Sequence, residues 1–207
     1  MSEITWTFKP YNREVWNKSK TRVMFVGADP NGDKEGDVLK RIKDMGEWFE
    51  KAPANKYFGR GGKQFYTRTE IMLKGILPNE ANPFNHMRFI DLKAEEGVSR
   101  ASEEEVEKYV VKHMQDISKY FQGSTAPRYV VLLGNYAQRV FIKYRDELID
   151  NGSKIQAICM PHPSHTIDYI SLKVESENLK DKFRPYNATL KRYFFKSKKN
   201  SGWMWLG

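Results

Sequence analysis

The chain contains a single cysteine, Cys159, among 207 residues. One cysteine excludes a disulfide framework within the chain and any metal or iron–sulfur site built only of cysteines. No apolar stretch is long enough to cross a membrane, and the first residues do not show the pattern of a signal peptide. Internal repeats and low-complexity linkers are also missing. We therefore expect a cytoplasmic protein without membrane contact, folded as a single domain over residues 1–207.

Basic residues outnumber acidic ones, with 35 Lys and Arg against 26 Asp and Glu and a net charge of +9. A basic surface suits a polyanion, and nucleic acid is the commonest one. The same charge is also compatible with a merely soluble basic protein. Apolar residues make up 40% of the chain and aromatic residues 14%, which is typical of a folded globule with a real core.

Apolar and β-branched runs alternate with segments of helical periodicity along the chain. The runs typical of buried strands are residues 22–28, 87–92, 128–134 and 154–159. The helical patterns are residues 36–51, 63–76, 102–121, 136–150 and 170–197, the last interrupted or kinked at Pro185. Strands that alternate with helices imply parallel crossovers. The predicted fold class is therefore α/β, a three-layer α/β/α sandwich with a central four-stranded parallel sheet.

The two ends of the chain have no place in that sheet. Residues 1–20 are expected to wrap around the periphery of the domain. The tail, residues 196–207, combines lysines with Trp203 and Trp205. Basic and aromatic side chains together suit a nucleic-acid contact. The tryptophans are also compatible with packing on the body of the domain, the alternative that we favour.

Two short polar segments follow the first and the last predicted strands. They are Gly27-Ala28-Asp29-Pro30 and His162-Pro163-Ser164-His165. Ligands of open α/β sheets bind beyond the carboxyl ends of the strands, so Asp29 and His162 are expected to face one cleft. A carboxylate and an imidazole placed in this way can stabilise a cation and a leaving anion on opposite sides of one bond. The plainer alternatives are that Asp29 caps the next turn and that His162 is a loop histidine held by backbone bonds.

Two further segments complete an ordered set. They are Phe58-Gly59-Arg60-Gly61-Gly62 and Leu132-Leu133-Gly134-Asn135-Tyr136-Ala137-Gln138. In this order the segments resemble the uracil-DNA glycosylase superfamily over about residues 22–170. The resemblance implies a monofunctional DNA glycosylase of base-excision repair, which flips a base out of DNA and hydrolyses its N-glycosidic bond to leave an abasic site. It implies DNA as the partner, single- or double-stranded, a monomeric protein, and neither a metal nor a cofactor.

The resemblance also assigns roles to individual residues. Asp29 would stabilise the positive charge that develops on the sugar and position the attacking water, and His162 would donate a hydrogen bond to the departing base. Tyr57 or Phe58 would stack on the flipped base, and Ala28 would contact it. The glycine-rich segment next to these aromatic residues is also compatible with a simple turn beside core side chains.

Contacts to the DNA strand are implied for a second group of residues. They are Arg60, Ser164, His165, Thr166 and Ile167. His165 stands where members of the family often carry a proline. Ile167 is our candidate for the apolar residue that wedges into the base stack, and a changed loop shape is the alternative.

The second predicted strand departs from the family pattern at its end. Members usually place there an Asn that reads uracil, whereas this chain has Asp91. An ionised Asp offers only acceptors, which suit an exocyclic amino group better than the 4-keto oxygen of uracil. The expected target is therefore uracil or a modified or amino-bearing pyrimidine, or alternatively the modified cytosine of viral DNA in a defence role. It also stays open whether Asp91 is a helix cap or ion-pair partner, and whether the chain is an inactive module that binds DNA or protein.

Overall fold

The fold is built around one mixed β-sheet. The computed structural model describes residues 10–28, 59–93, 101–150, 153–163, 172–173 and 176–185, with side chains from Phe65 onward in the second range. Within these ranges five strands follow the order β2-β1-β3-β4-β5. The parallel strands are β1 (Val23–Gly27), β2 (Met87–Asp91), β3 (Tyr129–Leu133) and β4 (Gln156–Met160). The fifth strand, β5 (Arg184–Pro185), runs antiparallel to β4.

The α/β class and the positions of the four parallel strands are confirmed, but the prediction of a four-stranded sheet was wrong. Strand β5 has only two residues, which is too short to leave a pattern in the sequence. Pro185 has no N–H to donate to a neighbouring strand, and proline is therefore tolerated in edge strands such as this one. The interruption that we expected at Pro185 is thus an extended segment, and the described helix before it, α10 (Leu179–Lys182), ends ahead of Phe183.

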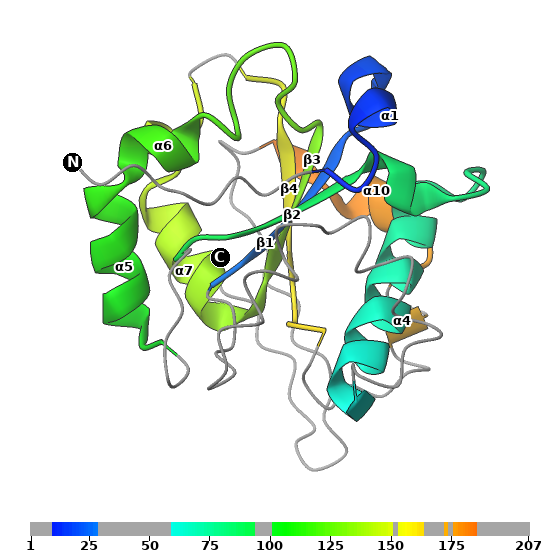
Figure 1. The fold of residues 1–207 in the computed structure, drawn as a ribbon, viewed down its shortest axis with the longest axis horizontal. Coiled ribbons are helices and arrows are strands. Elements are labelled where there is room, and N and C mark those ends of the chain that lie inside the picture. Colours follow the sequence, from blue (N-terminus) through cyan, green and yellow to red (C-terminus); the bar gives the residue numbers. More distant parts are fainter. Residues whose placement is uncertain are drawn as a thin grey trace.

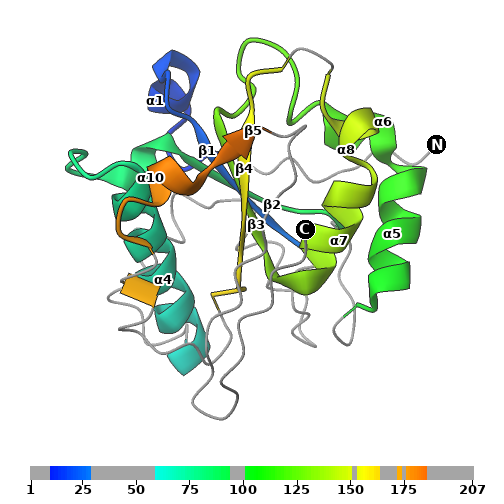
Figure 2. The ribbon, with the colours of Figure 1, turned by 180° about the vertical axis from the view of Figure 1, so that it is seen from behind.

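Helices cover both faces of the sheet (Figure 1 and, from behind, Figure 2). One face carries α5 (Glu103–Lys112), α6 (Met114–Ser118), α7 (Gly134–Lys143) and α8 (Arg145–Leu148). The other face carries α4 (Gly59–Ile76) and α10. Successive strand residues serve opposite faces: Met24 and Val26 pack under α5–α8, and Phe25 packs under α4. Within the described ranges, no helix combines the length and the apolar character that crossing a membrane requires.

The helix boundaries differ from the expected ones where local chemistry intervenes. The predicted helix over residues 102–121 begins with a capping box, in which Ser102 Oγ accepts from Glu105 N and Glu105 Oε2 accepts from Ser102 N. It then divides at His113 into α5 and α6. Helix α4 begins at Gly59, so the glycine-rich segment forms the first turn of a helix and not a separate turn. The helix expected over residues 36–51 and the tail over residues 196–207 lie outside the described residues.

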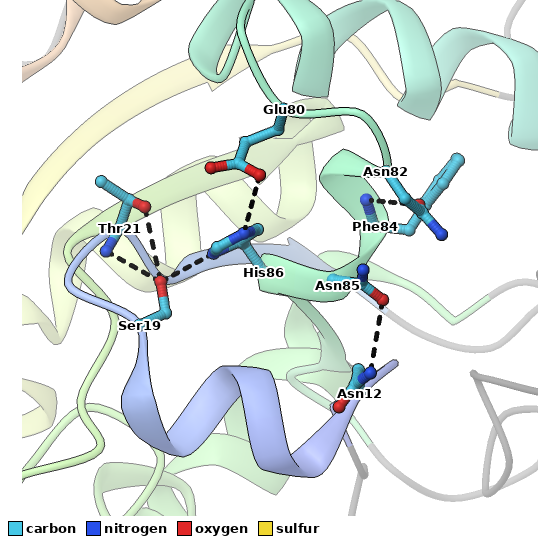
Figure 3. Close-up of polar contacts among 8 residues, drawn as sticks. All are labelled: Asn12, Ser19, Thr21, Glu80, Asn82, Phe84, Asn85 and His86. Atoms are coloured by element: carbon cyan, nitrogen blue, oxygen red, sulfur yellow. Dashed lines mark hydrogen bonds and ion pairs between the residues drawn. The ribbon is translucent and has the colours of Figure 1, made fainter.

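The N-terminal segment that we expected to wrap the domain contains α1 (Arg13–Lys18), whose Trp16 is fully buried. A polar network joins the end of α1 to the 3₁₀ helix η2 (Pro83–His86), just before β2 (Figure 3). In it Ser19 Oγ lies 2.7 Å from His86 Nδ1, and Glu80 Oε2 lies 3.4 Å from His86 Nε2. Since η2 leads directly into β2, these contacts fix α1 at the edge where the parallel strands begin.

Candidate active site

The carboxyl ends of the parallel strands gather polar and aromatic groups. Asp91 ends β2, and Gly27, its register partner, ends β1. Gly134 directly follows β3, and His162 lies two residues beyond β4. The two polar segments that begin at Gly27 and His162 therefore start from the same edge of the sheet, as predicted.

Asp91 folds over the end of β1. An ideal Cβ added to Gly27 would lie 2.1 Å from Asp91 Oδ1 and 3.1 Å from Phe89 Cζ. Any side chain at position 27 would therefore displace the carboxylate, so that glycine is required here for close approach rather than for backbone freedom. Asp91 is only 5% exposed. A carboxylate held at this depth is protected from bulk water and kept in one place.

A second glycine brings His162 close to the sheet. Gly134 has a φ of +75°, a left-handed conformation that strains residues with a side chain. A Cβ at this position would also lie 3.2 Å from the Cβ of His162. Gly134 thus lets α7 start immediately after β3 while the half-buried His162 passes beside it.

Two buried side chains hold the segment around His162. Gln138 Nε2 donates to Leu132 O at 3.2 Å and to Met160 O at 2.7 Å, and therefore ties the ends of β3 and β4 together. Arg68 Nη1, from α4, donates to Pro163 O at 2.5 Å. Arg68 is 6% exposed, and its burial lowers the pKa of the guanidinium below its usual range. The backbone on either side of His162 is thus held from both faces of the sheet.

The ring of Phe65 packs against Phe89 of β2 and against His162, which follows β4. Its ring centroid lies 5.8 Å from that of His162 and 5.4 Å from that of Phe89, with an edge-to-face angle of 74° to the latter. Phe89 and Asp91 are two residues apart on β2 and therefore point to the same face. Phe65, Asp91 and His162 consequently approach one corner, at the carboxyl edge on the side of α4.

Sequence reasoning missed the positioning roles of Phe65, Arg68 and Gln138. Phe65 and Arg68 are three residues apart, which places them on one face of α4. Gln138 belonged to a segment that we had singled out, but nothing in its position told a buried cross-link from a surface glutamine.

The structure describes the remaining predicted site residues to different extents. Ala28 is partly buried, and its carbonyl accepts from Lys93 N at 2.9 Å, so the pairing of β1 and β2 continues one step past the strands. For Arg60, in the first turn of α4, the structure describes the backbone alone. The other predicted site residues lie outside the described residues: Asp29, Tyr57, Phe58, Ser164, His165, Thr166 and Ile167.

The protein is thus an α/β domain with a mostly parallel sheet, a class that binds ligands at the carboxyl edge of the sheet. Here that edge carries a carboxylate, an imidazole and an aromatic ring. Within this class, the model of the uracil DNA glycosylase superfamily matches residues 15–191, and the chain belongs to this family. No curated protein and no solved structure gave a significant match. Family membership suggests a DNA glycosylase, a hydrolase that acts on DNA in base excision.

Proposed function

We propose that the protein flips a pyrimidine out of DNA and hydrolyses its N-glycosidic bond, and that the base is uracil or a modified or amino-bearing pyrimidine. The observation that carries the proposal is the convergence of Asp91, His162 and Phe65 at the carboxyl edge, in a chain that belongs to the uracil DNA glycosylase superfamily. Opening of the bond leaves a cation-like sugar and an anionic base, so the site needs a group for each.

The sugar side of the reaction is assigned to Asp29. The C1′–N bond breaks with its electron pair going to the base, and a water oxygen forms the new bond to C1′. A carboxylate can stabilise the positive sugar and take the proton that the water loses. In the sequence Asp29 stands two residues after Gly27, the last residue of the strand that Asp91 overlies.

The base side is assigned to His162, which would donate a hydrogen bond to the oxygen where negative charge develops. One preorganised donor of this kind contributes about 100-fold or more to the rate. The hydrogen bonds of Gln138 and Arg68 to the neighbouring carbonyls support this role, because a donor is effective only if it is held in position. Tyr57 or Phe58 is proposed to stack on the base.

Base selection is assigned to Asp91. Its carboxylate would accept a hydrogen bond from an exocyclic amino group, such as that of cytosine or a cytosine derivative. This favours a second candidate function, a defence enzyme that excises modified cytosine from viral DNA. The buried position of Asp91 over β1 supports a reading role, because a fixed carboxylate discriminates better than a mobile surface one.

The proposal is tested with oligonucleotides that carry uracil, hypoxanthine, cytosine or modified cytosines. After incubation with the protein, alkali cleaves the strand at abasic sites, and gel electrophoresis measures the cleaved fraction. We expect at least one pyrimidine substrate to be cleaved. If none is cleaved while salt-sensitive DNA binding persists, the chain is a binding module and not an enzyme.

Asp91→Asn tests base selection in the same assay. Because an amide can both donate and accept, we expect the ratio of uracil to amino-bearing base excision to rise by about tenfold or more. Asp116→Asn, which changes a carboxylate of α6 paired with Lys119 at the surface, serves as the matched control. An unchanged ratio in Asp91→Asn would remove Asp91 from the reading role.

A further inference from the structure

A basic pocket lies at the opposite edge of the sheet, where the parallel strands begin; this edge is at the top of Figure 1, beside α1. Arg22 directly precedes β1, Arg128 directly precedes β3, and Lys154 lies two residues before β4. The pocket has a volume of about 520 Å³, within the range of small-ligand sites. The strands β1, β3 and β4 have 5 residues each. They therefore separate the pocket from the candidate active site by roughly 16 Å.

Positive charge dominates the lining of this pocket. The cationic side chains are Lys20, Arg22, Arg128 and Lys154, and they face one carboxylate, that of Asp150. Within the described part of the chain, none of the four cations forms an ion pair with an acidic side chain. Four cationic side chains gathered around a single carboxylate leave an excess of positive charge, which favours the binding of an anion.

Both arginines are held in place by backbone carbonyls. Arg22 Nε donates to Ala126 O at 2.8 Å, and Arg128 Nη1 donates to Lys154 O at 2.7 Å. A guanidinium has five N–H donors, so each arginine keeps others for a ligand. Burial lowers the pKa of Arg22 below its usual range, a sign that this cation has lost part of its water. A partly desolvated and oriented guanidinium is well suited to bind a phosphate through two hydrogen bonds.

We propose that this pocket, which we call the amino-edge pocket, binds a phosphate-bearing anion. Two core residues, Phe121 and Ile155, also belong to the lining of the pocket. The volume exceeds that of a bare phosphate, so an organic group attached to the phosphate also fits. The pocket is separate from the proposed active site, and the proposal does not depend on glycosylase activity.

The test is calorimetric titration of the full chain with pyrophosphate at constant ionic strength. We expect saturable binding that the double variant Arg22→Gln/Arg128→Gln weakens by about tenfold or more, because charge-assisted hydrogen bonds are lost. The double variant Lys108→Gln/Lys112→Gln removes the same charge from exposed positions on α5 that do not line the pocket, and is expected to bind like the wild type. Absence of saturable binding, or equal affinity in both double variants, would overturn the proposal.

Further variants and a competition experiment test whether a loss of binding reflects the site itself and which phosphate it binds. Lys20→Gln and Lys154→Gln change exposed side chains that do not support the loops, and each is expected to weaken pyrophosphate binding by about threefold in a folded protein. Unchanged affinity in both would count against the site even if the arginine variants fail to fold.

A DNA duplex without damage is then added to the pyrophosphate complex. Displacement assigns the phosphate to a DNA backbone, and persistence assigns it to a small phosphate ester; either result supports an anion site.

Discussion

The two edges of the sheet use arginine in opposite ways. At the carboxyl edge, Arg68 is buried and donates to Pro163 O beside His162. At the amino edge, Arg22 and Arg128 each donate to one loop carbonyl and line an open pocket with further cations. The first arrangement uses a buried guanidinium to hold the backbone next to His162, the residue that we propose donates to the departing base. The second keeps charge available to a ligand. In our proposals, one sheet thus supports base excision at one edge and anion binding at the other.

The largest expected effect on activity comes from a methyl group at Gly27, at the carboxyl edge. In Gly27→Ala the new Cβ would clash with Asp91 Oδ1, and the displaced carboxylate would disturb the base site. We expect the single-turnover excision rate to fall by about 100-fold, because a base that is held about an ångström out of place reacts about 100 times more slowly.

The control is Gly75→Ala at the amino-edge end of α4. There a Cβ would lie 1.8 Å from the backbone oxygen of Ser176, so the steric conflict is at least as severe but concerns helix packing. Overpacking of this kind costs about 1–3 kcal/mol of stability. The excision rate of the folded protein should stay near that of the wild type, and equal rate losses in the two variants would show that Gly27 has no special relation to the site.

A second prediction compares two cross-links between β3 and β4. Gln138→Leu removes the buried hydrogen bonds at the carboxyl edge and leaves two carbonyl groups without their donor, which costs about 2–3 kcal/mol. Arg128→Gln removes a more exposed hydrogen bond at the amino edge and should cost about 0.5 kcal/mol. Urea unfolding of both variants measures the difference. Equal losses would mean that the two edges are held with similar strength.

The smallest effect concerns an ion pair that belongs to neither edge. Hydrogen bonds from Lys143 and Tyr144 to Glu107 link α5 to the end of α7 and lower the pKa of the Glu107 carboxyl below its usual range. A carboxyl whose folded pKa is lowered adds stability above its unfolded pKa and loses that contribution as the pH falls through the folded pKa. In Glu107→Gln we expect a slightly shallower fall of the urea midpoint between about pH 7 and about pH 3. An identical fall in wild type and variant would contradict this assignment.

The sequence predicted the parts of the fold that repeat. The four parallel strands are apolar runs with helices between them, and the polar segments after them mark the carboxyl edge. Strand β5 escaped prediction because two residues carry no periodicity, and its partner β4 is distant in sequence. Arg68 and Gln138 escaped for a similar reason, since their acceptors Pro163 O and Met160 O lie 95 and 22 residues away. Periodicity in the sequence predicts helices and strands. Contacts between segments that are distant in the sequence determine which polar side chains hold the fold together.

We propose that base excision takes place at the carboxyl edge through Asp29 and His162. The most direct test is the single-turnover rate of abasic-site formation on the best substrate of the oligonucleotide panel. Asp29→Asn and His162→Ala are compared with Lys108→Gln, a surface change on α5. Each site variant is expected to be slower by about 100-fold or more, whereas Lys108→Gln is expected to keep the wild-type rate. Site variants as fast as the wild type, at equal amounts of folded protein, would contradict it.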